Sequence, residues 1–182
     1  MTSAFHRDGD MLVRIPMTWE DYLSHDDLVP SEYYGGSLVM VPAPSVRHQH
    51  IIGRVYDLIR PHLAPGHTAT FGAGWSPDGV QEELIPDLMV HRPTRDRVVR
   101  TPPALVVEVL SSNRGDDLVA KMNRYAAWGA PSYWIVDPRD RVVLEHRLVD
   151  GSVVEVGRHT EGTVTLSYSD VKVPVDLDEL FA

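Results

Sequence analysis

The chain contains no cysteine, which excludes several kinds of site at once. Without cysteine there is no disulfide bond, no thiolate zinc site and no cysteine nucleophile. The same absence fits a reducing compartment, so we expect a cytoplasmic protein. No apolar run approaches the ~20 residues that a membrane helix needs, and we therefore expect no membrane association. The first ten residues are polar and lack the apolar centre of a secretion signal.

Basic residues are also scarce, because 17 lysines and arginines face 26 aspartates and glutamates, for a formal net charge of −9. This charge argues against broad electrostatic attraction to nucleic acid. It does not exclude a nuclease, because carboxylates that cluster around a metal ion count as negative until they hold it. Four arginines between residues 92 and 100 form a local exception. They belong either to a solvated loop or to a phosphate-contacting edge beside Asp87.

The composition that is present, 43% hydrophobic and 24% charged in 182 residues, is that of a globular protein. We find no internal repeat, low-complexity block or linker between domains. We therefore expect a single domain over residues 1–182, with residues 1–15 as a flexible arm.

Hydrophobic spacing and turn residues predict alternating helices and strands. The expected helices cover residues 17–23, 46–63, 116–128 and 177–181. Thr18 caps the first of these helices and Ser45 caps the second. The expected strands cover residues 32–34, 37–41, 68–74, 84–90, 104–110, 132–137, 141–149, 152–158 and 163–168. This order predicts an α/β fold with a central mixed β-sheet flanked by helices and an antiparallel C-terminal meander. Residues 104–137 should form a β-α-β unit.

Two carboxylates, Asp87 and Glu108, interrupt otherwise apolar strands. Burial of an unpaired carboxylate costs several kcal/mol or more unless it is paired, protonated or bound to a metal. If the two strands are neighbours, alternation of side chains can place Asp87 and Glu108 side by side. Like charges at that distance strongly raise one pKa unless a cation lies between them. Mg²⁺ or Mn²⁺ suits such oxygen ligands.

Lys121 lies on the helix that follows the Glu108 strand. Its long stem can return the ammonium group to the end of that strand, where it can position a water molecule or offset transition-state charge. Tyr125, four residues later on the same helix face, can orient the lysine or a phosphate. Simpler interpretations are a surface pair between Lys121 and Asp117, a core role for Tyr125, and a half-exposed or salt-bridged Glu108.

His48 and Glu32 are further candidates with two interpretations each. His48 lies near the start of a helix on its inward face, so it can approach the metal site or a phosphate, or form hydrogen bonds at the edge of the core. His50 should lie on the surface. Glu32 precedes the Gly35-Gly36 turn and is either a further acidic ligand or an exposed hairpin residue.

The order Pro86-Asp87, then Glu108 in a strand, then a lysine resembles the PD-(D/E)xK nuclease superfamily. The chain is most similar to the restriction-endonuclease-like proteins of the Uma type over most of its length. The matching motifs are residues 36–45 with His48, residues 86–90, residues 105–111, Asp117 with Lys121 and Tyr125, and residues 129–138. The superfamily lysine usually lies two residues after the acidic residue, where this chain has Leu110. Lys121 fits the displaced position on the following helix that is known in the superfamily.

The resemblance implies a restriction-endonuclease-like core and a metal-dependent nuclease that hydrolyses DNA phosphodiester bonds. Asp87, Glu108 and the backbone carbonyl of Val109 would bind Mg²⁺ or Mn²⁺, and Lys121 would position water. A competing hypothesis is a catalytically inactive interaction module with the nuclease fold. The acidic charge, Leu110 and the lack of a recognisable DNA-reading element favour this alternative.

Two other expectations concern activity class and assembly. The sequence has no nucleophile elbow, phosphate-binding loop or paired-histidine zinc motif, so another type of hydrolase ranks last. A homodimer could form through the strand at residues 133–136 or through the tail meander.

Overall fold

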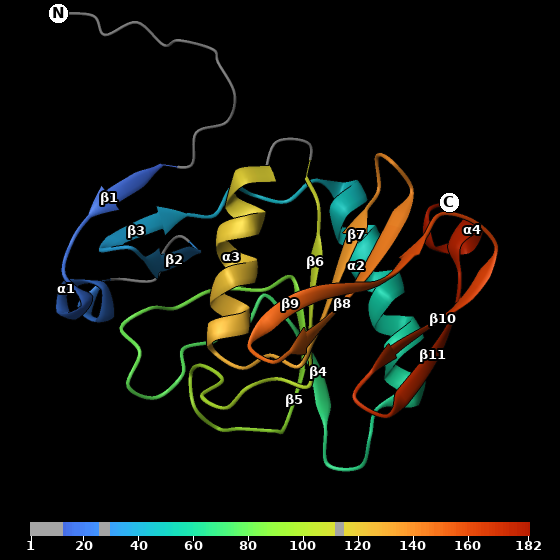
Figure 1. The fold of residues 1–182 in the computed structure, drawn as a ribbon. Helices are drawn as coiled ribbons and strands as arrows, with labels where there is room; N and C mark the ends of the chain where they lie inside the picture. The colour runs from blue at the N-terminus through green and yellow to red at the C-terminus, as the bar shows by residue number, and fades with distance from the viewer. Residues whose placement is uncertain (1–12, 26–29, 112–114) are drawn as a thin grey trace, which may run out of the picture.

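The computed structural model describes residues 13–25, 30–111 and 115–182, without the side chains of residues 115–117. Its main element is a six-stranded sheet in the order β4-β5-β6-β7-β8-β9 (Figure 1). These strands are β4 (Thr68–Phe71), β5 (Leu88–His91), β6 (Leu105–Val109), β7 (Ser132–Asp137), β8 (Val142–Val149) and β9 (Ser152–His159). All neighbours are antiparallel except β6 and β7, which are parallel and joined by α3 (Gly115–Ala127). The predicted mixed sheet and β-α-β unit are thus confirmed.

The sheet separates two cores because successive side chains of a strand point to opposite faces. On β6, Val107 and Val109 join the core under α2 (Val46–Ile59), whereas Val106 joins the core under α3. Figure 1 shows these two helices on opposite sides of the sheet. Glu108, which shares the face of Val106, therefore points towards α3.

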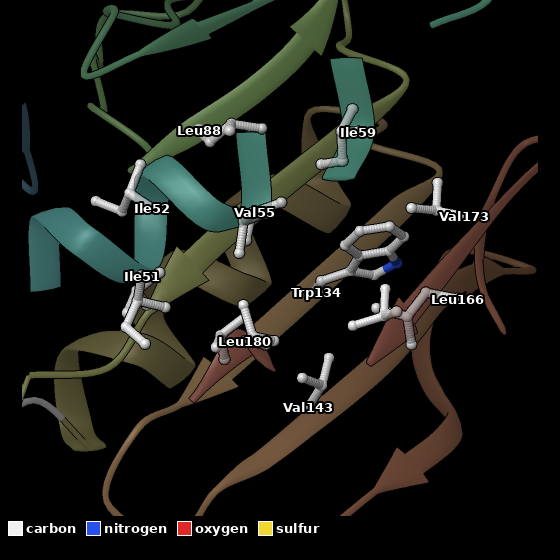
Figure 2. Close-up of a cluster of buried hydrophobic side chains, with 14 of the residues drawn as sticks. Ile51, Ile52, Val55, Ile59, Leu88, Trp134, Val143, Leu166, Val173 and Leu180 are labelled. Carbon is white, nitrogen blue, oxygen red and sulfur yellow. The ribbon is translucent and has the colours of Figure 1, made fainter. Parts of the chain in front are cut away.

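The α2 core follows the helical period that the sequence shows. Ser45 caps the helix by accepting a hydrogen bond from the His48 backbone N–H. Apolar side chains of α2, including Val55 and Ile59, pack around Trp134 in Figure 2. Burial of each such side chain stabilises the fold by about 1.5–3 kcal/mol. The α-helix ends at Ile59 and continues as a 3₁₀ turn, η1 (Arg60–His62), because Pro61 has no N–H for the α-helical pattern.

The N-terminal hairpin forms a sheet of its own, apart from the central mixed sheet. Its order is β1-β3-β2, with β1 (Arg14–Pro16), β2 (Ser31–Tyr34) and β3 (Ser37–Met40). Gly35 and Gly36 have φ angles of 60° and 71°, as a two-residue hairpin turn requires. The helix α1 (Trp19–Ser24) begins after Thr18, which accepts from the Asp21 N–H as predicted.

Arg14 and Ile15, the last residues of the expected N-terminal arm, pair with β3. Residues 1–12 lie outside the described part of the chain.

The C-terminal strand at residues 163–168 does not join the meander as predicted. It is β10 (Thr163–Tyr168), and it pairs with β11 (Val171–Asp176) in a two-stranded sheet of its own. The apolar side chains of both strands complete the α2 core. The sequence does not predict β11, because this segment contains Pro174 and proline is disfavoured in the interior of a strand. The predicted docking helix is present as α4 (Leu177–Leu180).

The topology also bears on assembly and location. β7 lies between β6 and β8, so residues 133–136 offer no open edge and that route to a homodimer is wrong. β9 is an edge strand, and pairing through the tail meander stays a prediction. Within the described ranges, no helix combines the length and apolar character needed to cross a membrane.

Candidate active site

Asp87 lies immediately before β5, one residue outside the strand in which it was predicted. Leu88 pairs with Val107 in the antiparallel register. Extension of this register by one residue places Asp87 opposite Glu108. The Asp87 Oδ2 atom accepts a hydrogen bond of 2.8 Å from the backbone N–H of Val109. The carboxylate is therefore fixed to the main chain directly after Glu108.

Glu108 is buried on the α3 side of the sheet, with 6% of its surface exposed. Its Oε1 atom accepts a hydrogen bond of 2.6 Å from the Tyr125 hydroxyl and lies 3.9 Å from Lys121 Nζ. Burial raises the pKa of Glu108 to about 8; Lys121 opposes this shift, and the charge of Asp87 adds to it. In the absence of a bound cation, Glu108 therefore keeps its proton at neutral pH.

Lys121 is a buried residue rather than half of a surface helix pair. Only 5% of its surface is exposed, and its Nζ donates a hydrogen bond of 2.6 Å to Glu32 Oε1. The side chain of Asp117, its alternative partner in the sequence, lies outside the described residues. Lys121 thus lies beside both Glu32 and Glu108.

Glu32 is 2% exposed, so the interpretation as an exposed hairpin residue is wrong. The oxygen that accepts from Lys121 also accepts a hydrogen bond of 2.8 Å from the Ile85 N–H. Ile85 lies two residues before Asp87, so Glu32 links the approach to β5 with α3. This geometry favours a role in holding Lys121 over the predicted role of a further acidic ligand.

Tyr125 is both a core aromatic and a polar part of the site. Its ring is 1% exposed and stacks on Trp75 with centroids 5.6 Å apart, while its hydroxyl donates to Glu108. Burial, followed by the charges of Glu108 and Glu32, raises the pKa of Tyr125 well above its usual value. The phenol therefore stays protonated and remains a hydrogen-bond donor.

His48 approaches the site from α2, on the other side of the sheet from Lys121. Its Nε2 atom lies 3.0 Å from the Val109 carbonyl oxygen and 3.2 Å from Asp87 Oδ2. It is 8% exposed, so the interpretation as a hydrogen-bonded residue at the core edge holds, while a role towards a metal or a phosphate stays a prediction. His50 is exposed, as expected.

The arginines between residues 92 and 100 follow the opposite end of β5 from Asp87. Two of them support the fold: Arg97 pairs with the buried Glu83, and Arg100 donates to the Ser76 carbonyl. Arg92 and Arg95 are exposed. This placement favours the loop interpretation over a phosphate-contacting edge beside Asp87.

The donor chemistry of the site fits a hard divalent cation. Among the described residues, Asp87 Oδ1 and Glu108 Oε2 receive no hydrogen bond, and the Val109 carbonyl lies beside them in the chain. No group of three or more histidine, aspartate or glutamate side chains in these ranges is arranged to hold a metal. The donor set is therefore two carboxylates and one carbonyl, and Mg²⁺ commonly completes such a set with water.

Comparison with known proteins assigns the family. The sequence model of Uma2, described as "Putative restriction endonuclease", matches residues 19–173. The chain belongs to the Uma2 family. The matched range includes Asp87, Glu108 and Lys121. No curated protein matches this chain.

A solved structure supports the fold of this Uma2 protein. It is described as "a putative nuclease belonging to DUF820 from Anabaena variabilis ATCC 29413". The TM-score is 0.76 at 19% sequence identity, over 91% of this chain and 98% of that chain. The α/β restriction-endonuclease-like fold predicted from the sequence is thus confirmed.

The sequence did not reveal the contacts of Arg124, which lies near Lys121 on α3. Arg124, one helical turn after Lys121, pairs with Glu82, and its guanidinium lies over the ring of Tyr34. The signal that could have identified Arg124 is its position three residues after Lys121, on a neighbouring part of the same helix surface.

Proposed function

We propose that this protein is a metal-dependent nuclease that hydrolyses DNA phosphodiester bonds. The observation that carries the proposal is the meeting of the half-buried Asp87 with the buried Glu108 and Lys121, which come from separate parts of the chain. Asp87, immediately before β5, lies opposite Glu108 on the adjacent antiparallel strand β6, and Lys121 reaches Glu108 from α3. Two carboxylates and a cation at one strand end form the arrangement that phosphodiester hydrolysis requires.

The metal-binding role belongs to Asp87, Glu108 and the Val109 carbonyl. Bound Mg²⁺ or Mn²⁺ lowers the pKa of a coordinated water and stabilises negative charge on a phosphate. Asp87 is held by the Val109 N–H, so its carboxylate needs little rearrangement to serve as a ligand. Glu108 must release the proton that its raised pKa retains, and Tyr125 continues to orient the resulting carboxylate.

Besides the metal ion, the positive charge at the site comes from the side chain of Lys121. Its ammonium is fixed by Glu32 and lies 3.9 Å from Glu108, so it can donate a hydrogen bond to an attacking water or to a phosphate oxygen. Because the site is largely shielded from water, this charge acts more strongly than it would at the surface. His48 supports the other side by its contacts with Asp87 and the Val109 carbonyl.

A cleavage assay with defined DNA tests the proposal. We expect cleavage with Mg²⁺ or Mn²⁺, none with a chelator, and loss of cleavage in Asp87→Ala and Glu108→Ala. Asp57→Ala, which removes an exposed carboxylate on α2, is the matched control and should retain activity. Cleavage that survives both site substitutions would contradict the assignment. A parallel assay with RNA tests whether DNA is the substrate.

A further inference from the structure

Arg124 joins three parts of the chain beside the proposed catalytic lysine. Its Nε and one terminal nitrogen donate to the two carboxylate oxygens of Glu82, at 3.0 and 3.3 Å. Its guanidinium also lies 4.6 Å from the centroid of the Tyr34 ring on β2. A third contact, to the Ala120 carbonyl at 3.2 Å, holds the side chain against its own helix.

Tyr34 is the central member of this group and is 2% exposed. A second guanidinium, that of Arg14 on β1, also lies 4.6 Å from its ring centroid and donates a hydrogen bond of 3.0 Å to its hydroxyl. Glu82 accepts a further hydrogen bond of 3.0 Å from the Gly35 N–H, at the end of β2. We call Arg14, Tyr34, Glu82 and Arg124 the arginine–tyrosine clamp.

The clamp lies next to the Glu32–Lys121 ion pair on both of the elements that it joins. Tyr34 is two residues after Glu32, so the two side chains share one face of β2. Arg124 is three residues after Lys121, so both lie on neighbouring parts of the α3 surface. Any movement of β2 away from α3 would therefore separate Glu32 from Lys121 and Tyr34 from Arg124.

The small N-terminal sheet needs such a contact, because its strands do not pair with a strand of the six-stranded sheet. In the described part of the chain, a bridge between Tyr33 and Glu83 provides the backbone pairing between this sheet and the segment before β5. The position of Glu32 relative to Lys121 thus depends on this bridge, on the Ile85 N–H contact and on side-chain contacts between β2 and α3.

We propose that the arginine–tyrosine clamp is a positioning device that keeps β2 docked on α3 and thereby fixes the Lys121 ammonium on Glu32. Its four members are positioning residues, since they act through Glu32 and do not reach the carboxylates of the site. The consequence for cleavage rests on the proposed nuclease function. The consequence for Lys121 itself does not, and this difference makes the two ideas separable.

The lysine content of the chain allows a direct test. Lys121 and Lys172 are the only lysines, and Lys172 is exposed on β11. Mild acetylation followed by mass spectrometry gives the labelling rate of Lys121 relative to Lys172, which serves as the internal standard. In the protein without substitutions, we expect Lys121 to react with the acetylating reagent at least tenfold more slowly than Lys172.

The variants are chosen to separate the clamp from general stability. We expect Arg124→Ala and Tyr34→Ala to raise the relative labelling of Lys121 several-fold, while Tyr34→Phe, which keeps the ring, changes it little. Ile59→Val weakens the remote α2 core, and Arg158→Ala removes an exposed arginine; neither should change the ratio. All labelling is done at low temperature, on variants whose circular dichroism matches that of the protein without substitutions.

The outcomes decide between the alternatives. An unchanged Lys121 ratio in both Arg124→Ala and Tyr34→Ala, or an equal rise in Ile59→Val, would overturn the positioning role. If one clamp variant fails to fold, Glu82→Gln replaces it as a milder disruption. In cleavage assays, clamp variants should lose kcat with KM and metal dependence retained. If the unmodified protein does not cleave DNA, the proposed function fails, and the labelling result still tests the clamp.

Discussion

Glu32 on β2 and Lys121 on α3 form a buried ion pair of 2.6 Å between residues that are 89 positions apart in the chain. The pair places a positive charge beside Glu108, which would otherwise be a buried acid facing a second acid. It also connects the N-terminal sheet to the helix that bears the lysine. The same contact thus belongs to the fold and to the proposed chemistry.

A double-mutant cycle on this pair tests its contribution to stability. Glu32→Leu leaves the Lys121 ammonium without its closest carboxylate, and we expect a loss of about 3–5 kcal/mol in the free energy of unfolding. The double variant Glu32→Leu with Lys121→Met should be more stable than Glu32→Leu alone, since it removes the isolated charge. Urea unfolding at neutral pH measures the free energy of unfolding of Glu32→Leu, of Lys121→Met and of the double variant. If the effects of the two single changes simply add up in the double variant, the ion pair is contradicted.

The raised pKa of Glu108 predicts a pH-dependent stability in the presence of a chelator. Its pKa is about 8 in the folded state and has a reference value of 4.5. Between these values the folded state binds the proton more strongly, so stability declines as the pH rises towards 8 and levels off above it.

Glu108→Gln removes this dependence because an amide does not ionise in this range. From pH 5 to 8, we expect the unmodified protein to lose up to about 1.4 kcal/mol per pH unit relative to this variant. Thermal or urea unfolding at several pH values provides the measurement. Parallel stability curves for the two proteins would contradict the raised pKa.

Tyr125→Phe should shift the pH dependence of metal binding. The Tyr125 hydroxyl donates to Glu108 and lowers its pKa, so removal of the hydroxyl should raise that pKa further. Metal must compete with the Glu108 proton, and the midpoint of Mn²⁺ binding should therefore move to higher pH. The pH at which Mn²⁺ begins to raise Tm reports this midpoint. Tyr56→Phe on α2 is the control, and an equal shift in both variants would rule out the specific contact.

Metal binding should itself stabilise the folded protein. At a Mn²⁺ concentration 100 times Kd, we expect about 2.7 kcal/mol of added stability, which calorimetry detects as a higher Tm. Asp87→Ala should lose most of this gain, whereas Asp57→Ala should keep it. A protein whose Tm does not respond to divalent metal would fit the alternative of a catalytically inactive interaction module.

Much of the candidate site was predictable because its members belong to local patterns. The sequence marks Glu108 as an acid in an apolar strand and Lys121 as a lysine on the helix that follows it. Glu32 was harder to interpret, because its neighbours in sequence form an ordinary hairpin while its partners lie on α3 and before β5. The clamp residues have no local signal of comparable strength.

The sequence by itself determined the helices, most strands and the family, because hydrophobic period, caps and turn residues act over a few positions. The tertiary structure decided which elements meet. It separated the N-terminal hairpin from the main sheet, paired β10 with β11, and brought His48 and Lys121 to Asp87 and Glu108 from opposite faces. These outcomes depend on packing and register between distant segments, which no short stretch of sequence encodes.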